Sequence, residues 1–115
     1  MQIMQRLGLS VALSPAGGMA ARRAIAATGL SPDTSGLRIA AKPNDTGCSF
    51  TFSIEQNARD TDYIIAQHGV RVFVDPFSAE HVDGSEIDFV HTDAGASFTL
   101  TPPERFRNWK APLVA

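Results

Sequence analysis

The most reactive side chain in this sequence is that of Cys48, the single cysteine among 115 residues. Its thiolate is a soft, anionic donor for metals such as iron, and it can also act as a nucleophile. A hydrolase built on a cysteine needs a base and an orienting group nearby in space, which a sequence cannot show. Free cysteines are also commonly buried, so Cys48 could be a small, half-buried residue without chemistry. One thiolate alone does not make a site.

Histidines and carboxylates form a second group of potential ligands. They are His68, His81, His91, Asp83, Glu86 and Asp88. Their spacing matches neither the His-Glu-x-x-His motif nor a zinc finger, so we predict structural roles for them. We expect His68 in a turn, and we expect His91 to be partly buried on the strand face that carries Ile87 and Phe89.

The segment 104–110 interleaves three basic, one acidic and two aromatic side chains. Tryptophan and arginine are favoured anchors in protein interfaces, and aromatic rings can stack on nucleic acid bases. Chain termini often pack on their own domain or lack fixed structure. We rank that structural interpretation first, docking to a partner protein second and binding to nucleic acid last.

A helix is predicted over residues 16–27. Ser14 can cap its start, Pro15 suits the first helical position, and Gly29 suits the left-handed exit. The two glycines in its first turn are expected to weaken it by roughly 1 kcal/mol each relative to alanine. Its apolar face is shallow, so we expect the helix to depend on the rest of the fold for stability.

Beyond Pro32 the apolar pattern alternates, which predicts strands. Three segments have apolar residues on one face, namely Leu37, Ile39 and Ala41, then Phe50, Phe52 and Ile54, then Val70, Val72 and Val74. His68-Gly69 separates the segments 63–67 and 70–75, and glycine accepts the positive φ of a tight turn. These two segments are therefore predicted to pair as a hairpin.

Further short elements follow this hairpin. Residues 78–82 predict a short helical turn, and residues 86–92 and 97–101 predict two more strands. Pro102-Pro103 ends the last strand because neither residue donates a backbone hydrogen bond. The expected fold is mainly β (α+β), a compact domain of short, mostly antiparallel strands with one substantial N-terminal helix.

Composition indicates an ordinary single globular domain, with 43% hydrophobic and 19% charged residues. The net charge of −2 provides no global attraction for nucleic acid or anionic lipid. The N-terminus lacks the pattern of a secretory signal, and long apolar stretches are absent, so we expect no membrane association and a cytoplasmic location. A lone cysteine allows no internal disulfide, which agrees with a reducing compartment.

Several phrases of the sequence are typical of one family. They are Val11-Ala12-Leu13-Ser14-Pro15-Ala16, Leu37-Arg38-Ile39, Thr46-Gly47-Cys48-Ser49, Val72-Phe73-Val74-Asp75-Pro76 and Asp83-Gly84-Ser85-Glu86-Ile87-Asp88-Phe89. The last is the most specific, because a lone Gly-Cys would mean little. Over roughly positions 11–101 the chain resembles the A-type iron-sulfur carrier family, also called HesB-like or IscA-like.

The resemblance implies a domain that forms dimers or larger assemblies, binds iron or a [2Fe-2S] cluster, and supplies clusters to client proteins. The family uses one cysteine in a Gly-Cys-Ser-Gly-like loop and two more in a C-terminal Cys-Gly-Cys. Cys48 matches the first and is therefore the expected metal and cofactor ligand. The C-terminal pair aligns with Trp109, Lys110 and Ala111, none of which replaces a thiolate. The glycine expected soon after Cys48 is also missing, which implies a shorter or stiffer loop.

The family match sets further expectations. It divides the chain into an N-terminal extension at 1–10, a HesB-like domain at 11–103 and a C-terminal tail at 104–115. The acidic residues of the last matching phrase are expected to form turns and hydrogen bonds. The expected function is that of a non-enzymatic accessory or carrier protein in iron-sulfur cluster assembly, with an assembly or client protein as partner and a homo-oligomeric state. The alternative is an interaction or regulatory module that has lost metal binding.

Overall fold

The computed structural model describes residues 9–45 and 47–102, which form two helices and seven strands. In chain order the elements are β1 (Val11–Leu13), α2 (Pro15–Thr28), β2 (Gly36–Asn44), β3 (Gly47–Glu55), β4 (Tyr63–Gln67), β5 (Val70–Val74), α3 (Pro76–Val82), β6 (Ser85–Thr92) and β7 (Gly95–Thr101). Among these described residues, neither helix is long and apolar enough to cross a membrane. The predicted tail 104–115 and residues 1–8 of the predicted extension lie outside the described residues, so the domain boundaries stay predictions.

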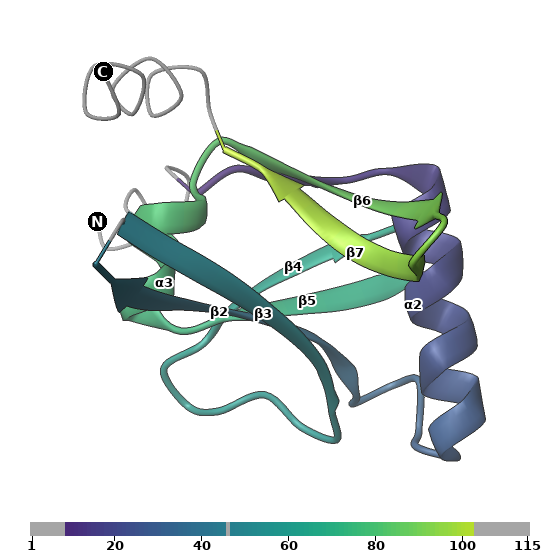
Figure 1. Cartoon of the computed structure of the whole chain (residues 1–115). Coiled ribbons are helices and arrows are strands. Elements are labelled where there is room, and N and C mark those ends of the chain that lie inside the picture. Colours follow the sequence, from purple (N-terminus) through teal and green to yellow (C-terminus); the bar gives the residue numbers. More distant parts are fainter. Residues whose placement is uncertain (1–8, 46, 103–115) are drawn as a thin grey trace.

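The strands form two sheets that pack against each other, with α2 along one end (Figure 1). The four-stranded sheet has the order β3-β2-β5-β4, and the three-stranded sheet has the order β1-β6-β7. The pairs β2–β5 and β1–β6 are parallel, whereas the other three pairs are antiparallel. The predicted mainly β fold, with mostly antiparallel strands and one substantial helix, is confirmed.

The core lies between the sheets because each sheet directs one alternating row of apolar side chains inward. Leu37 of β2 lies opposite Ile54 of β3 and Val72 of β5, so the three predicted apolar rows share this inner face. Ile87 of the other sheet is completely buried against them. Burial of each such side chain contributes about 1.5–3 kcal/mol. The alternation read from the sequence therefore identifies the buried face.

Helix α2 begins and ends where its capping residues predict. The N–H of Gly17 donates to Ser14 Oγ at 2.9 Å, and Pro15 occupies the first turn. The chain leaves the helix at Gly29 with a φ of 76°, in the left-handed region. The helix extends the predicted range by one residue at each end.

The turn between β4 and β5 is the predicted hairpin. His68 and Gly69 have φ values of 53° and 73°, and a type I′ turn requires positive φ at both central residues. Gln67 lies opposite Val70, which leaves two residues in the connection. The predicted turn position of His68 is thereby confirmed. Arg22 of α2 donates a hydrogen bond from Nη1 to the carbonyl of His68, so the helix is attached to this turn.

The glycine pair of α2 has a packing role that the sequence analysis does not predict. A Cβ on Gly18 would lie 2.7 Å from Cβ of His68, and a Cβ on Gly17 would lie 2.9 Å from Cδ1 of Leu13. Both distances are shorter than van der Waals contact. The expectation that these glycines only weaken the first turn is therefore incomplete, because they allow the helix to approach the sheets.

Strand β1 is a further element that the sequence analysis does not predict. Its backbone is bonded on one side to β6 and on the other to a side chain, that of Gln67 at the end of β4. The N–H of Leu13 donates to Gln67 Oε1 at 2.7 Å, and Gln67 Nε2 donates to the carbonyl of Val11 at 2.6 Å. The amide thus takes the place of a neighbouring strand and joins the two sheets.

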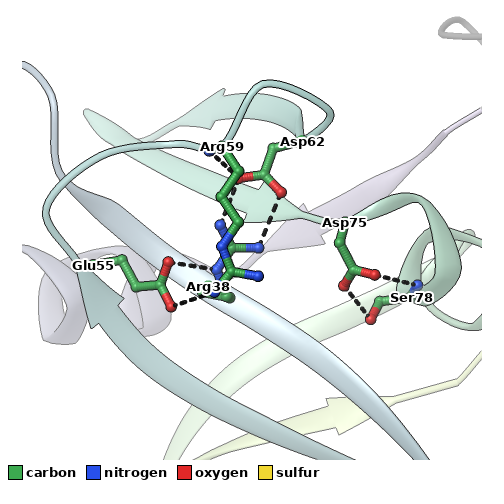
Figure 2. Close-up of polar contacts among 6 residues, drawn as sticks. All are labelled: Arg38, Glu55, Arg59, Asp62, Asp75 and Ser78. Atoms are coloured by element: carbon green, nitrogen blue, oxygen red, sulfur yellow. Dashed lines mark hydrogen bonds and ion pairs between the residues drawn. The ribbon is translucent and has the colours of Figure 1, made fainter.

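The outer face of the four-stranded sheet carries a buried ionic network, which Figure 2 shows. Arg38 is only 4% exposed. Its guanidinium donates from Nε to Glu55 at 2.6 Å and from both terminal nitrogens to Asp62. The backbone N–H of Arg59 also donates to Asp62 at 2.7 Å. These bonds hold the β3–β4 connection against β2.

The network changes the acidity of Asp62. Burial raises the pKa of this carboxyl, but hydrogen bonds from the Arg38 side chain and the Arg59 backbone bring the pKa below its ordinary value. Because the folded-state pKa is the lower one, the unfolded state binds more protons in acid. The contribution of Asp62 to stability is complete above its ordinary pKa of 3.8 and is lost as the pH falls through the lower folded value.

Gly18→Ala is expected to lower the free energy of unfolding by about 1–3 kcal/mol, because the added Cβ meets that of His68. Helix propensity alone predicts the opposite, a gain of about 1 kcal/mol. Chemical denaturation measures the difference. The matched test is Gly18→Ala combined with His68→Gly, which removes the opposing Cβ at a position where glycine suits the positive φ. If the stability losses of the two single variants simply add in the double variant, the proposed contact is wrong.

Asp62→Asn is expected to cost about 3–5 kcal/mol at neutral pH, because it leaves Arg38 buried without full pairing. The variant should also lose less stability than wild type between neutral pH and pH 2, since the titrating carboxyl is gone. Urea denaturation across this pH range measures both effects. Asp60→Asn, at an exposed position two residues away, makes the same charge change and serves as the control. Parallel stability–pH curves for wild type and Asp62→Asn would contradict the assignment.

Candidate functional site

Cys48 is the second residue of β3 and lies at the end of the β2–β3 hairpin. It is opposite Pro43 and two residues before Phe50, so its side chain is on the inner face of the sheet. The side chain is half-buried. The thiol therefore extends the inward-facing row of Phe50 and Phe52, at the end of the sheet where the β2–β3 hairpin turns.

Strand pairing holds the backbone around Cys48. The ladder between β2 and β3 continues as far as Asn44 opposite Gly47, and only positions 45 and 46 connect the two strands. The family resemblance predicts Cys48 in a loop that is shorter or stiffer than in the family. In the structure the residue belongs to a strand, so its backbone direction is fixed by β2.

A serine on α3 anchors the same hairpin from the side. Ser78 Oγ accepts a hydrogen bond from the N–H of Ala41 at 2.9 Å. The same hydroxyl donates to Asp75 Oδ1 at 2.6 Å (Figure 2). Asp75 is the N-cap of α3, because its carboxylate also accepts from the N–H of Ser78. Ala41 lies two residues before Pro43, the partner of Cys48. The hydroxyl thus positions the strand that supports the thiol.

Neither of these two positioning residues is predicted from the sequence. The sequence pattern predicts a helical turn only from residue 78, whereas α3 begins at Pro76. Asp75-Pro76 is a capping residue followed by proline at the first helical position, so the start of α3 had a readable signal. The bond from Ala41 to Ser78 joins residues 37 positions apart and had none.

The histidines are distributed over three separate elements. His68 is exposed in the β4–β5 turn, and His81 packs on Phe77 within α3 with ring centroids 5.0 Å apart. His91 does share its strand face with Phe89, whose ring it meets edge-on at 5.6 Å. It is exposed, however, so the prediction of a partly buried imidazole is wrong. His91 is exposed because the residues opposite this end of β6, Gly95 and Ala96, are small and themselves exposed.

Two of the acidic residues have the predicted structural role. Asp83 accepts from the N–H of Ser10 at 2.6 Å, and Asp88 accepts from the hydroxyl of Ser14 at 2.6 Å. The Ser14 bond, followed by one from the N–H of Phe89, holds the pKa of Asp88 below its usual range. Glu86 is exposed and has no side-chain hydrogen bond within the described residues.

A single subunit does not provide a complete metal site in the part of the chain that the structure describes. No group of three or more His, Cys, Asp or Glu side chains is close enough there to hold a metal ion. Cys48 offers one thiolate, whereas iron in these clusters normally has four ligands. The positions that align with the family's other cysteines, 109–111, lie outside the described residues. These donors alone therefore do not fit a cluster.

Comparisons with known proteins relate this arrangement to a family. No protein-family model matches the chain. It is 33% identical over 78 residues to an uncharacterized protein of Rickettsia prowazekii, covering 65% of this chain and 69% of that protein. It is 32% identical over 60 residues to the iron-sulfur cluster insertion protein ErpA 2 of Methylococcus capsulatus, covering 50% and 46%. The chain thus spans about half to two thirds of the length of the relatives it matches.

Solved structures agree with these sequence matches. A crystal structure of IscA with the [2Fe-2S] cluster superposes with a TM-score of 0.71 at 20% identity, covering 82% of this chain and 86% of the other. Escherichia coli SufA, involved in biosynthesis of iron-sulfur clusters, gives a TM-score of 0.68 at 23% identity, covering 79% and 78%. These likenesses establish the fold. The chain belongs to the A-type, HesB-like carrier family.

Membership in the HesB-like family confirms the resemblance read from the sequence. A HesB-like chain with one cysteine has a hairpin that presents a single thiol, supported by Ser78 and Asp75. The contribution of this support to the stability of the monomer can be measured.

Ser78→Ala is expected to lower the free energy of unfolding by about 1–3 kcal/mol, because it leaves the buried N–H of Ala41 without an acceptor. The control is Ser49→Ala, which removes an exposed hydroxyl whose bond to the Lys42 carbonyl is 3.5 Å long. That change should stay within about 0.5 kcal/mol. Chemical denaturation of both variants measures the effects. Equal losses in the two would show that the Ser78 hydroxyl does not support the hairpin.

Proposed function

We propose that this HesB-like chain is an accessory or carrier-like protein of iron-sulfur cluster assembly, with iron or a [2Fe-2S] cluster as its cargo. One observation carries the proposal: the chain is similar to an iron-sulfur cluster insertion protein and keeps one cysteine on the structured hairpin. The proposed role is that of a carrier and not of an enzyme. Its partner would be an assembly or client protein.

The proposed ligand is Cys48, shared between subunits. A thiolate from each of two chains would bind one iron ion or cluster, and a small thiol, a histidine or water would complete the coordination. We propose sharing because one chain supplies only one thiolate. The proposed compartment is the cytoplasm, where a lone thiol stays reduced.

A second candidate function is a HesB-like interaction or regulatory module without metal. The observation that favours it is the ligand count itself. The described residues contain no group of potential ligands around Cys48. The positions aligned with the family's cysteine pair are Trp109, Lys110 and Ala111. The two candidates differ in one property, which is the binding of iron and sulfide.

Anaerobic reconstitution with ferrous iron and sulfide tests the proposal. The wild-type protein should acquire visible charge-transfer absorption and bind iron and sulfide at one cluster per two chains. Cys48→Ala should remain colourless, because no other cysteine exists in the chain. Ser49→Ala, a change of similar size at the next residue on the opposite face, should behave like wild type.

Each other result has a definite meaning. A wild-type protein that stays colourless and binds no iron would refute the carrier proposal and support the module without metal. A Cys48→Ala protein that binds as much iron and sulfide as wild type would refute the role of Cys48.

A further inference from the structure

The arginines of this chain are not equally paired with carboxylates. Those of the outer-face network form ion pairs, as described above. By contrast, Arg22, Arg23 and Arg71 form no ion pair within the part of the chain that the structure describes. Arg22 and Arg71 donate instead to backbone carbonyls, those of His68 and Pro32. A carbonyl accepts from a guanidinium without neutralising its charge.

The segments that carry these three arginines contain no acidic residue. The first carboxylate of the chain is Asp33, so residues 9–32 carry two arginines without a compensating charge. Residues 63–74 likewise include Arg71 and neither Asp nor Glu. The net charge of the whole chain is −2. The excess of positive charge is therefore a local property of these two segments.

Tertiary contacts bring the two segments together at one end of the fold. Helix α2 lies against the β4–β5 turn, because Gly18 leaves room for His68 and Arg22 donates to the carbonyl of that histidine. Arg71 of β5 reaches the loop after α2, where its Nη1 lies 3.1 Å from the carbonyl oxygen of Pro32. The helix, the turn and this loop thus carry the three arginines on adjoining surface.

The solvent-facing side of α2 also has an apolar centre. Met19 is 47% exposed. Residues three and four positions apart are neighbours on a helix, so Met19 lies between the exposed Arg22 and Arg23. Methionine is common at binding surfaces because its flexible thioether adapts to different apolar partners. We call Met19, Arg22, Arg23, His68 and Arg71 the basic surface.

The basic surface is remote from the cysteine. Figure 1 shows α2 at one end of the molecule, whereas the end of β2 and the start of β3 lie at the other. Cys48 is the second residue of β3 and belongs to that other end. A protein bound to α2 would therefore leave the hairpin that carries the thiol accessible.

We propose that the basic surface is a docking site for a partner protein, which binds it with an acidic amphipathic helix. Carboxylates of that helix pair with the three arginines, and its apolar side chains cover Met19. An apolar centre with a polar rim is the usual anatomy of a protein interface. The backbone of α2 is hydrogen-bonded within the helix, so contact is made through side chains and not by strand addition. The inference extends to both candidate functions, because it requires no metal.

Nucleic acid fits this surface less well than an acidic protein. Three arginines neutralise few phosphates, and the negative net charge of the chain opposes a polyanion. A phosphate backbone would also leave the exposed side chain of Met19 without an apolar partner. The mixture of charge and apolar area is what an amphipathic helix matches.

A synthetic helix provides the test. The probe is a peptide of about 18 residues, long enough to form a helix, with leucines on one face and glutamates beside them. In NMR titrations of the full-length chain, backbone signals of residues 19–27 and 68–71 should shift, and those of residues 47–54 should not. Arg23→Glu should raise the dissociation constant at least about tenfold, and Met19→Ala about fivefold.

Three controls separate local charge from other effects. Lys42→Glu makes the same charge change at an exposed position near the β2–β3 hairpin and should bind the probe like wild type. A probe with lysine in place of each glutamate should bind at least about tenfold more weakly. Cys48→Ala should bind the probe like wild type, so a failure of the cluster proposal leaves this result unchanged.

Several results would overturn the docking site. They are the absence of shifts with the acidic probe, equal affinity for the lysine probe, and equal weakening by Arg23→Glu and Lys42→Glu while circular dichroism shows both variants folded. Duplex DNA that shifts the same signals at lower concentration than the probe would assign the surface to nucleic acid and refute a protein partner. Loss of probe binding in Cys48→Ala would contradict the separation of the two ends.

Discussion

The buried guanidinium of Arg38 is the constraint on which the four-stranded sheet depends. It lies on the face of β2 opposite the apolar core, and a charge with so little exposure has to be paired. Its partners are Glu55 at the end of β3 and Asp62 just before β4, which are the two ends of the β3–β4 connection. The connection is therefore held against the outer face of the sheet. The buried ring of Phe73, opposite Arg38 on β5, lies 5.8 Å from the same guanidinium, so this face combines an aromatic ring with the paired charges.

Local signals were sufficient for most elements. Ser14, Pro15 and Gly29 predicted the limits of α2 to within one residue, and His68-Gly69 predicted the tight hairpin. The alternating apolar rows identified the inner face of the larger sheet because a side-chain period of two is visible in a single strand. Cys48 was identified by its type and by family resemblance, and its inward direction follows from the same alternation.

Contacts between distant segments account for what could not be predicted. A three-residue strand such as β1 shows no period, and nothing local in Gln67 indicates that its amide will serve as a strand partner. The close approach of Gly18 to His68 depends on how the helix crosses the turn. The bond of Ser78 to Ala41 likewise exists only once α3 lies beside β2. The support of the thiol thus belongs to tertiary structure, although the thiol itself is plain in the sequence.

The parallel pairing of β1 with β6 has a consequence for the order in which the chain can fold. Ser14, which caps α2, also bonds to Asp88, 74 positions later. Contacts of such separation form slowly, because a long loop has to close before they add stability. A nascent chain that stops before β6 leaves Val11 and Leu13 without their strand partner and Ser14 without the carboxylate of Asp88. Ribosomal pausing ahead of β6 should therefore produce a species with exposed apolar surface that chaperones bind, and not a smaller folded domain.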